Sequence, residues 1–211
     1  MENEMIKEKY SISKVEHYEK WFNTNDKLFE TELEAIKQLL PPNTEAIEIG
    51  VGTGIFATQL GISIGVEPSE EMATAARKKG IKVIRGRGEN IPITTKTYQL
   101  VLMVTADCFL DDIAKSFSQI HRILVDHGIF IIAFLDRNTP LGSFYEKNKH
   151  NSNSYKNANF RSTTEIIRLL KGASFNIIAQ RQTIFTLENI RQEIKEGSGE
   201  GVFAVIKAKK M

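Results

Sequence analysis

Three glycines at every second position form the part of this chain best suited to bind a ligand. They lie in the stretch EIGVGTG, which runs from Glu48 to Gly54. Glycine allows a tight turn and carries no side chain, so a ligand can lie against bare backbone. The P-loop pattern GxxxxGK[ST] is absent, and the third glycine comes one residue too early for the dinucleotide pattern GxGxxG.

An acidic residue follows this loop at a spacing typical of nucleoside recognition. Glu67 ends the strand-like run ISIGVE and lies 17 positions after Gly50. A carboxylate at the tip of the second strand of a doubly wound sheet lies beside the ligand of the first loop. There it accepts hydrogen bonds from both ribose hydroxyls, and it would repel a 2′-phosphate.

Alternating strand and helix patterns surround these residues. The apolar runs LVLMV and IFIIAF are typical of strands that helices cover on both faces. We expect an α/β fold: a three-layer, doubly wound Rossmann-like sheet of seven strands, mostly parallel, with an antiparallel C-terminal edge hairpin. The predicted strands are 45–49, 62–66, 81–85, 98–104, 128–135, 175–185 and 201–210, and the predicted helices include 54–60, 69–79, 112–125 and 162–171.

The chain is predicted to form a single domain, because 211 residues suffice for one core. Apolar spacing near three and four predicts two helices over 14–40, broken at Asn23 to Asp26. The polar segment 137–161 is a candidate lid over an acceptor pocket, with a surface insertion as the equal alternative. The predicted parts are a helical cap (1–43), a cofactor-binding core (44–136), the candidate lid (137–161) and a C-terminal helix with hairpin (162–211).

Composition argues against several classes of protein. The net charge is +2 and the basic residues form no concentrated tract, so we expect no nucleic-acid partner. The single cysteine, Cys108, rules out an internal disulfide and a multi-cysteine zinc site. The N-terminal MENEMIKEKY lacks a secretory apolar region and no apolar run reaches membrane-span length, so we expect a cytoplasmic protein without a membrane span.

The chain resembles the class I S-adenosylmethionine-dependent methyltransferases, in the ubiquinone/menaquinone-methyltransferase-like (methyltransferase type 11) group. The resemblance extends from about Thr44 to Lys210. Four blocks carry it in the family's order: EIGVGTG (48–54), GVEPSEEM (65–72), GRGENIPI (86–93) and HRILVDHG (121–128). It implies S-adenosyl-L-methionine as cofactor and S-adenosyl-L-homocysteine as product.

The resemblance also implies a role for each matching residue. Those expected to bind the methionine part and the ribose are Glu48, Gly50, Val51, Gly52, Thr53, Gly54 and Glu67. Those expected beside the adenine and near the sulfonium are Pro68, Met72, Gly88, Glu89, Val104 and Thr105. Glu89 could instead cap a turn, and Met72 could instead pack in the core. Arg87 departs from the family, which usually has Asp there, so backbone groups would contact the adenine.

Candidate acceptor residues lie outside the four blocks. They are Tyr18 and Trp21 ahead of the first strand, and Phe144, Tyr145 and His150 in the candidate lid. Packing of the N-terminal aromatic residues on the core is an equal alternative. Asp107, Asp111 and Asp112 could hold a divalent metal, but Asp111 and Asp112 are better explained by the dipole of the following helix. We therefore predict no metal.

The expected function is methyl transfer from S-adenosylmethionine to an unidentified small molecule. The cofactor is already activated, so the protein mainly aligns donor and acceptor, and no catalytic residue can be assigned. The amino-group DNA methyltransferase motif and the Pro-Cys of cytosine-C5 enzymes are absent. The alternatives are an NAD-binding oxidoreductase and a non-catalytic S-adenosylmethionine-binding protein. A monomer or a homodimer is expected.

Overall fold

The computed structural model describes residues 14–152 and 154–211, in which strands and helices alternate. The strands are β1 (Ala46–Ile49), β2 (Ile64–Glu67), β3 (Lys82–Arg85), β4 (Tyr98–Val104), β5 (Leu124–Leu135), β6 (Phe175–Thr183), β7 (Lys195–Glu196) and β8 (Phe203–Lys210). The helices are α2 (Lys14–Thr24), α3 (Asp26–Lys37), α4 (Ile55–Gln59), α5 (Glu70–Lys78), α6 (Ile113–Ile123), α7 (Pro140–Asn148) and α8 (Thr163–Gly172). Two short 3-10 helices are η1 (Asp107–Phe109) and η2 (Lys149–Asn151).

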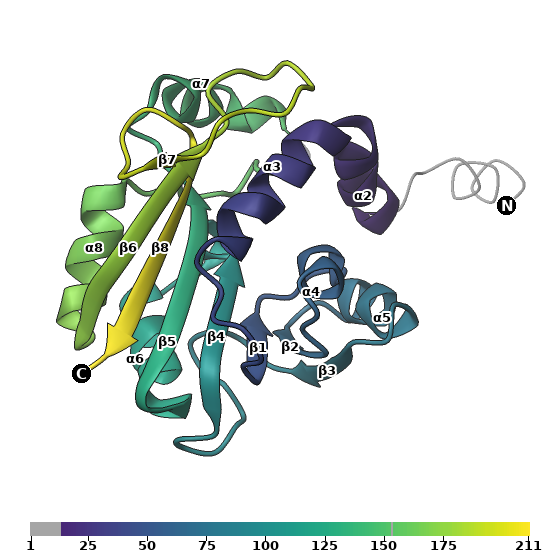
Figure 1. The fold of residues 1–211 in the computed structure, drawn as a ribbon. Helices are drawn as coiled ribbons and strands as arrows, with labels where there is room; N and C mark the ends of the chain where they lie inside the picture. Colours follow the sequence, from purple (N-terminus) through teal and green to yellow (C-terminus); the bar gives the residue numbers. More distant parts are fainter. Residues whose placement is uncertain (1–13, 153) are drawn as a thin grey trace, which may run out of the picture.

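All described strands belong to one sheet, in the order β3-β2-β1-β4-β5-β8-β6-β7 (Figure 1). The first five run parallel, whereas β8 runs antiparallel to both β5 and β6. This confirms the predicted Rossmann-like α/β fold with antiparallel C-terminal strands. The strand order reverses between β1 and β4, and ligands of such sheets bind at the carboxyl ends beside that reversal.

Residues of β4 alternate between two hydrophobic layers, as a strand covered on both faces requires. Leu100, Leu102 and Val104 pack with α3 and α4 on one side. Val101 and Met103 pack with α6 and α8 on the other. Figure 1 shows α6 and α8 together on one side of the sheet, with α3 and α4 on the opposite side. The two layers hold the sheet in place, and the loops of the site follow its strands.

The structure differs from the predicted strands at two places. The sheet of the described residues has eight strands, because the two-residue β7 pairs with β6 at Arg181 and Gln182. Two residues carry too little pattern to predict a strand. β5 begins at Leu124 rather than at Gly128, since Leu124 pairs with Tyr98 ahead of a register shift.

Segment 137–161 is more regular than a polar loop. Pro140 occupies the first turn of α7, and the Thr139 hydroxyl accepts a hydrogen bond from the Gly142 N–H at 3.0 Å. A capping residue followed by proline is a typical helix start, so this signal was available in the sequence. The segment leaves and rejoins the sheet through a bridge between Asp136 and Arg161.

Within residues 14–152 and 154–211, no helix has the length and apolar composition needed to cross a membrane. The decapeptide MENEMIKEKY, and with it the start of the predicted 1–43 cap, lies outside the described residues.

Candidate active site

The glycine loop between β1 and α4 has the backbone that only glycine adopts readily. Gly50, Gly52 and Gly54 have φ angles of 75°, 56° and 76°. A Cβ on Gly50 would lie 2.4 Å from the Ala106 Cβ, so this glycine permits close packing against the end of β4. A Cβ on Gly52 would meet nothing within 4 Å, so this side of the loop faces open space.

Glu67, at the carboxyl end of β2, joins this loop to the start of α5. Its Oε2 accepts a hydrogen bond from the Gly52 N–H at 2.9 Å, and its Oε1 accepts one from the Ser69 N–H at 2.8 Å. The side chain is buried, and burial raises the pKa of Glu67 against the effect of these two donors. Each oxygen keeps a lone pair for a further donor such as a sugar hydroxyl.

Glu48 lies one strand away with an unsatisfied oxygen. The residue is 2% exposed, and its Oε2 has no hydrogen-bond partner among the described residues. Burial raises the pKa of Glu48 well above its usual range, and the charge of Glu67 adds to the effect. A buried acceptor without a donor is costly, so this oxygen fits a ligand that brings one, such as an amino group.

The loop after β3 is tied to the start of α6 by Glu89. Its Oε1 accepts hydrogen bonds from the N–H groups of Asp111 at 2.9 Å and Asp112 at 3.4 Å. Burial opposes ionisation, but the backbone donors, with Arg87 beside them, lower the pKa of Glu89. Arg87 also forms an ion pair with Asp111. Glu89 therefore caps a turn, as the alternative explanation held, and this turn forms the edge of the site.

The other residues implied by the resemblance lie at the ends of β2 and β4, after β3 and in the first turn of α5. Pro68 is exposed, and Met72 is half-buried in the first turn of α5, which Ser69 caps. Gly88 packs so closely that a Cβ there would lie 2.7 Å from the Ser116 Oγ. Val104 is buried at the end of β4, where the next residue, Thr105, has a φ of 48°.

The three aspartates after β4 have different surroundings. Asp112 caps α6 by accepting a hydrogen bond from the Lys115 N–H at 2.9 Å, and Asp111 pairs with Arg87. Asp107 is buried, and burial raises its pKa to about 7, opposed by Arg161. Among the described residues no group of His, Cys, Asp and Glu is arranged to hold a metal ion.

The N-terminal aromatic cluster divides between the core and the site. Trp21 packs edge-on against Phe22 with ring centroids 5.0 Å apart, and Phe22 packs on Phe56 of α4. Tyr18 instead faces the acidic groups: burial raises its pKa, and the charges of Glu48, Glu32 and Glu67 raise it further. Its hydroxyl thus lies within electrostatic reach of both cofactor-side carboxylates.

The candidate lid contributes Tyr145 to the interior and leaves its neighbours outside. Tyr145 packs against Tyr155 and Phe160, with ring centroids 6.0 and 6.4 Å apart. Phe144 is 50% exposed, and His150 is exposed on η2. Of the predicted acceptor residues, the structure therefore brings Tyr18 and Tyr145 toward the buried acidic groups and leaves Phe144 and His150 at the surface.

Glu32, a buried glutamate of α3, was not among the predicted site residues. Burial raises the pKa of Tyr155, a further aromatic residue of the candidate lid that follows η2, and the charge of Glu32 adds to the effect. A signal for Glu32 existed in the sequence, because it interrupts the apolar series Leu28 and Ile36 at a spacing of four.

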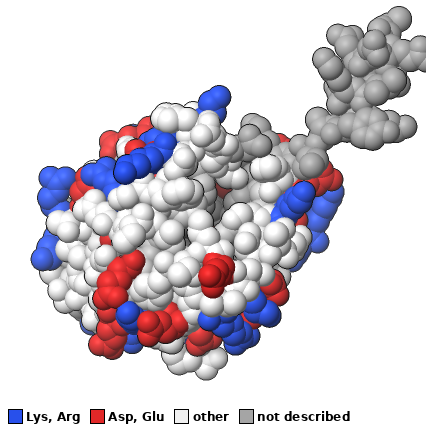
Figure 2. All heavy atoms as spheres, turned by 90° about the horizontal axis from the view of Figure 1, so that it is seen from above, with Lys and Arg blue, Asp and Glu red and all other residues white. Residues whose placement is uncertain are grey.

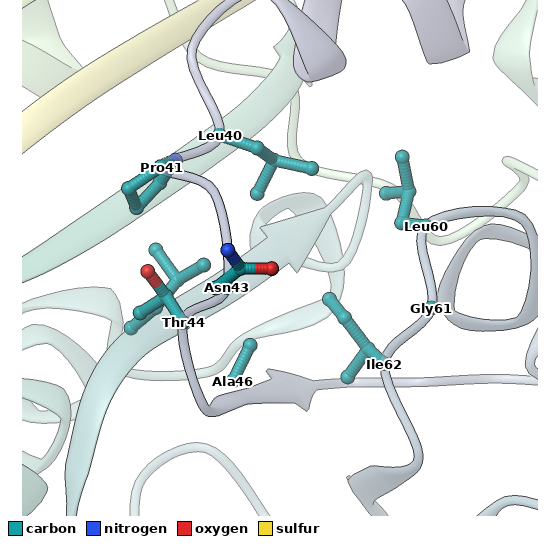
Figure 3. A pocket seen from close by; sticks show the side chains of 9 residues that line it. Leu40, Pro41, Asn43, Thr44, Ala46, Leu60, Gly61 and Ile62 are labelled. Carbon is teal, nitrogen blue, oxygen red and sulfur yellow. The ribbon is translucent and has the colours of Figure 1, made fainter.

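The face formed by the carboxyl ends of the parallel strands is hollowed. Figure 2 looks down on it and shows a depression near its middle. A second hollow of about 230 Å³ lies at the opposite, amino ends of β1 and β2. Figure 3 shows that aliphatic side chains such as Leu40, Leu60 and Ile62 surround it. It contains no titratable group and is far from the glycine loop, so it is not the reacting site.

Comparisons with known proteins agree with this geometry. The family model described as "Methyltransferase domain" matches residues 47–132. An uncharacterised protein of Methanocaldococcus jannaschii is 41% identical over 198 residues, which cover 93% of this chain and 96% of the relative.

Solved structures give the same result. A Thermotoga maritima protein, described as a SAM-dependent methyltransferase and possible histamine N-methyltransferase, superimposes with a TM-score of 0.90 at 44% identity. That match covers 94% of this chain and 96% of the other. An S-adenosylmethionine-dependent methyltransferase of Mesorhizobium loti matches at a TM-score of 0.67 and 17% identity, over 85% of this chain and 98% of the other, which shows a shared fold.

Proposed function

The chain belongs to the class I S-adenosylmethionine-dependent methyltransferases of the methyltransferase type 11 group, and from this premise we propose that it methylates a small molecule. S-Adenosyl-L-methionine is its cofactor. When bound, the cofactor supplies a methyl group on a positively charged sulfur, which needs no further activation by the protein. The acceptor and the roles of individual residues are the proposed part.

One observation carries the assignment of the cofactor residues: the Glu67 carboxylate bridges the glycine loop and the start of α5. It keeps free lone pairs beside the open face of Gly52. We assign Glu67 to the two ribose hydroxyls. We assign the unsatisfied Oε2 of Glu48, together with the glycine loop, to the amino-acid part. Glu89, Gly88, Pro68 and Met72 then border the adenine.

A small-molecule acceptor is supported by the groups that converge beside the cofactor residues. Buried Glu32 of α3 acts electrostatically on Tyr18 of α2 and on Tyr145 of α7. The description of the Thermotoga maritima protein names a small amine as a possible acceptor of that protein, which supports an acceptor of similar size here. The chain's task is to hold the acceptor in line with the methyl group and exclude water.

A methyl-transfer assay with radiolabelled S-adenosylmethionine tests this proposal. We expect label to move to at least one member of a small-molecule panel of amines, phenols, thiols and carboxylates. We expect Glu67→Ala to abolish the transfer, because the cofactor no longer binds. Exposed Glu71→Ala, four residues further along the chain, is the control.

The two alternatives predict different ligand responses. An NAD-binding oxidoreductase would be stabilised against heat by NAD(H) and not by S-adenosylhomocysteine, which would overturn the proposal. A non-catalytic binding protein would bind S-adenosylhomocysteine tightly and methylate no member of the panel.

A further inference from the structure

Glu32 is a buried carboxyl group on a helix face that is otherwise apolar. In α3, residues Leu28, Glu32 and Ile36 follow one another at a spacing of four and are 1%, 6% and 0% exposed. Residues at this spacing share one helix face. An aliphatic side chain at the middle position would stabilise the core, whereas a carboxylate costs free energy unless it has a partner. The position therefore calls for an explanation.

Nothing in the described part of the chain supplies such a partner. No described residue donates a hydrogen bond to Glu32 or forms an ion pair with it, and burial is the one cause that raises its pKa, to about 8. Two cations of segment 137–161 have partners elsewhere. Arg161 donates to the Asp107 carbonyl at 2.7 Å, and Lys149 pairs with Glu146 and donates to the Ala158 carbonyl.

Three tyrosines from separate segments lie within electrostatic reach of Glu32. Its charge raises the pKa of Tyr18 on α2, of Tyr145 on α7 and of Tyr155 after η2. For each of the three, burial is the larger cause. Glu32 thus lies where α2, α3 and segment 137–161 converge, rather than in a closed part of the core.

The wall on this side is aromatic. Tyr155 packs against Tyr145 with ring centroids 6.0 Å apart, against Phe160 at 5.3 Å, and in a stacked arrangement against Phe109 at 6.3 Å. Phe109 is 48% exposed and forms the outer rim of this wall. Aromatic faces attract organic cations, and they do so more strongly where water is excluded.

We propose that Glu32, with Tyr18, Tyr145 and Tyr155 around it, binds the acceptor as an organic amine in its cationic form. This inference rests on the proposed methyl-transfer function and names its substrate class. An ammonium group would satisfy the buried carboxylate through a charge-assisted hydrogen bond. An anionic acceptor would meet three buried carboxyl groups, Glu32, Glu48 and Glu67, which accept hydrogen bonds and repel an anion when they ionise.

The same arrangement connects the amine to the reaction. Tyr18 interacts electrostatically with Glu48 and Glu67 as well as with Glu32, so the proposed amine site adjoins the proposed cofactor residues. One ammonium proton passes to the Glu32 carboxylate, which frees the nitrogen lone pair. That lone pair forms the new N–C bond to the methyl carbon, and the electrons of the breaking C–S bond go to sulfur, which becomes a neutral thioether.

Calorimetric titrations in the presence of saturating S-adenosylhomocysteine test the inference without depending on turnover. The probes are butylamine, 2-phenylethylamine and 2-(imidazol-4-yl)ethylamine, each paired with the alcohol that replaces its amino group, and 3-phenylpropionate as the anion. We expect at least one amine to bind about tenfold or more tightly than its alcohol. We expect Glu32→Gln to remove this preference without changing the affinity for the alcohol. Glu34→Gln, on the exposed face of α3, should keep it.

The failures of the two proposals are distinguishable. Loss of S-adenosylhomocysteine binding by the folded wild-type protein would overturn the proposed function. If S-adenosylhomocysteine binds normally, three results would overturn the amine inference alone. These are that no amine in the panel binds, that the alcohols or the anion bind as tightly as the amines, or that Glu32→Gln weakens the binding of amine and alcohol to the same extent. Circular dichroism of the variant checks that it is folded.

Discussion

Two buried glutamates on opposite sides of the site show how differently its two halves are built. In the cofactor half, Glu89 accepts hydrogen bonds from the backbone N–H groups of Asp111 and Asp112, and its pKa is lowered. In the acceptor half, Glu32 has no donor among the described residues, and its pKa is raised to about 8. The first carboxylate stabilises the fold as it stands, whereas we propose that a bound ligand stabilises the second.

The cofactor half can be understood from the protein alone, and the acceptor half cannot. Backbone geometry fixes the cofactor half: left-handed glycines, a capped α5 and Glu67 on main-chain donors. The acceptor half depends on single side chains from distant segments, such as Tyr18 and Tyr145. Substitutions in the two halves should therefore affect stability with opposite sign.

The largest effect is expected from Glu32→Gln, as a gain in stability that grows with pH. The folded pKa of about 8 lies above the unfolded value near 4.5, so wild-type stability decreases as pH rises through this interval. The amide avoids this loss. We expect the gain in stability of the variant over wild type to be on the order of 3 kcal/mol larger at pH 8.5 than at pH 5. Urea unfolding at both pH values measures the two free energies of unfolding. A difference between variant and wild type that is the same at both pH values would contradict the contrast between Glu32 and Glu89.

Gly52→Ala should weaken binding of S-adenosylhomocysteine by about thirtyfold, or ~2 kcal/mol, because the new methyl group enters the open side of the loop. Gly61→Ala is a matched control. Both glycines have a positive φ, and a Cβ on either meets nothing within 4 Å. Both variants should therefore lose about 1 kcal/mol of stability from backbone strain. Equal affinities in the two variants would contradict the assignment of the glycine loop.

Glu89→Gln should destabilise the protein by about 1 kcal/mol at pH 7, since charge-assisted hydrogen bonds to two backbone donors are weakened. The folded pKa lies below the unfolded one, so this contribution is present above the unfolded pKa and disappears as pH falls through the folded pKa. Thermal unfolding from pH 7 down to pH 3 checks it. A stabilised Glu89→Gln would show that the two halves do not differ as described.

Tyr18→Phe is expected to have the smallest effect. Removing one hydroxyl between Glu48 and Glu32 should slow methyl transfer about threefold, or roughly 0.6 kcal/mol, and leave cofactor affinity unchanged. Tyr98→Phe, at the amino end of β4, is the control because it lies at the other end of the sheet. Steady-state kinetics with the amine found by titration measures the effect. A loss of cofactor affinity with an unchanged rate would show that Tyr18 belongs to the cofactor half.

The same division explains what the sequence could predict. The order of strands and helices and the glycine loop come from local patterns: apolar runs, glycine spacing and caps. β7 escaped prediction because two residues carry no periodicity, and α7 because its capping threonine and proline lay in a segment dominated by polar residues. Glu32 escaped because it approaches the tyrosines of segment 137–161 only through tertiary packing of segments more than 100 positions apart.

Calorimetric titration of S-adenosylmethionine into wild type, Glu67→Gln and Glu71→Gln tests the central claim most directly. Glu67 accepts from Gly52 and Ser69 in the site, whereas Glu71 is exposed on the next helix. We predict one cofactor per chain, about tenfold or more weaker binding in Glu67→Gln and unchanged binding in Glu71→Gln. No heat of binding in the folded wild-type protein, or equal affinity in all three proteins, would contradict the account.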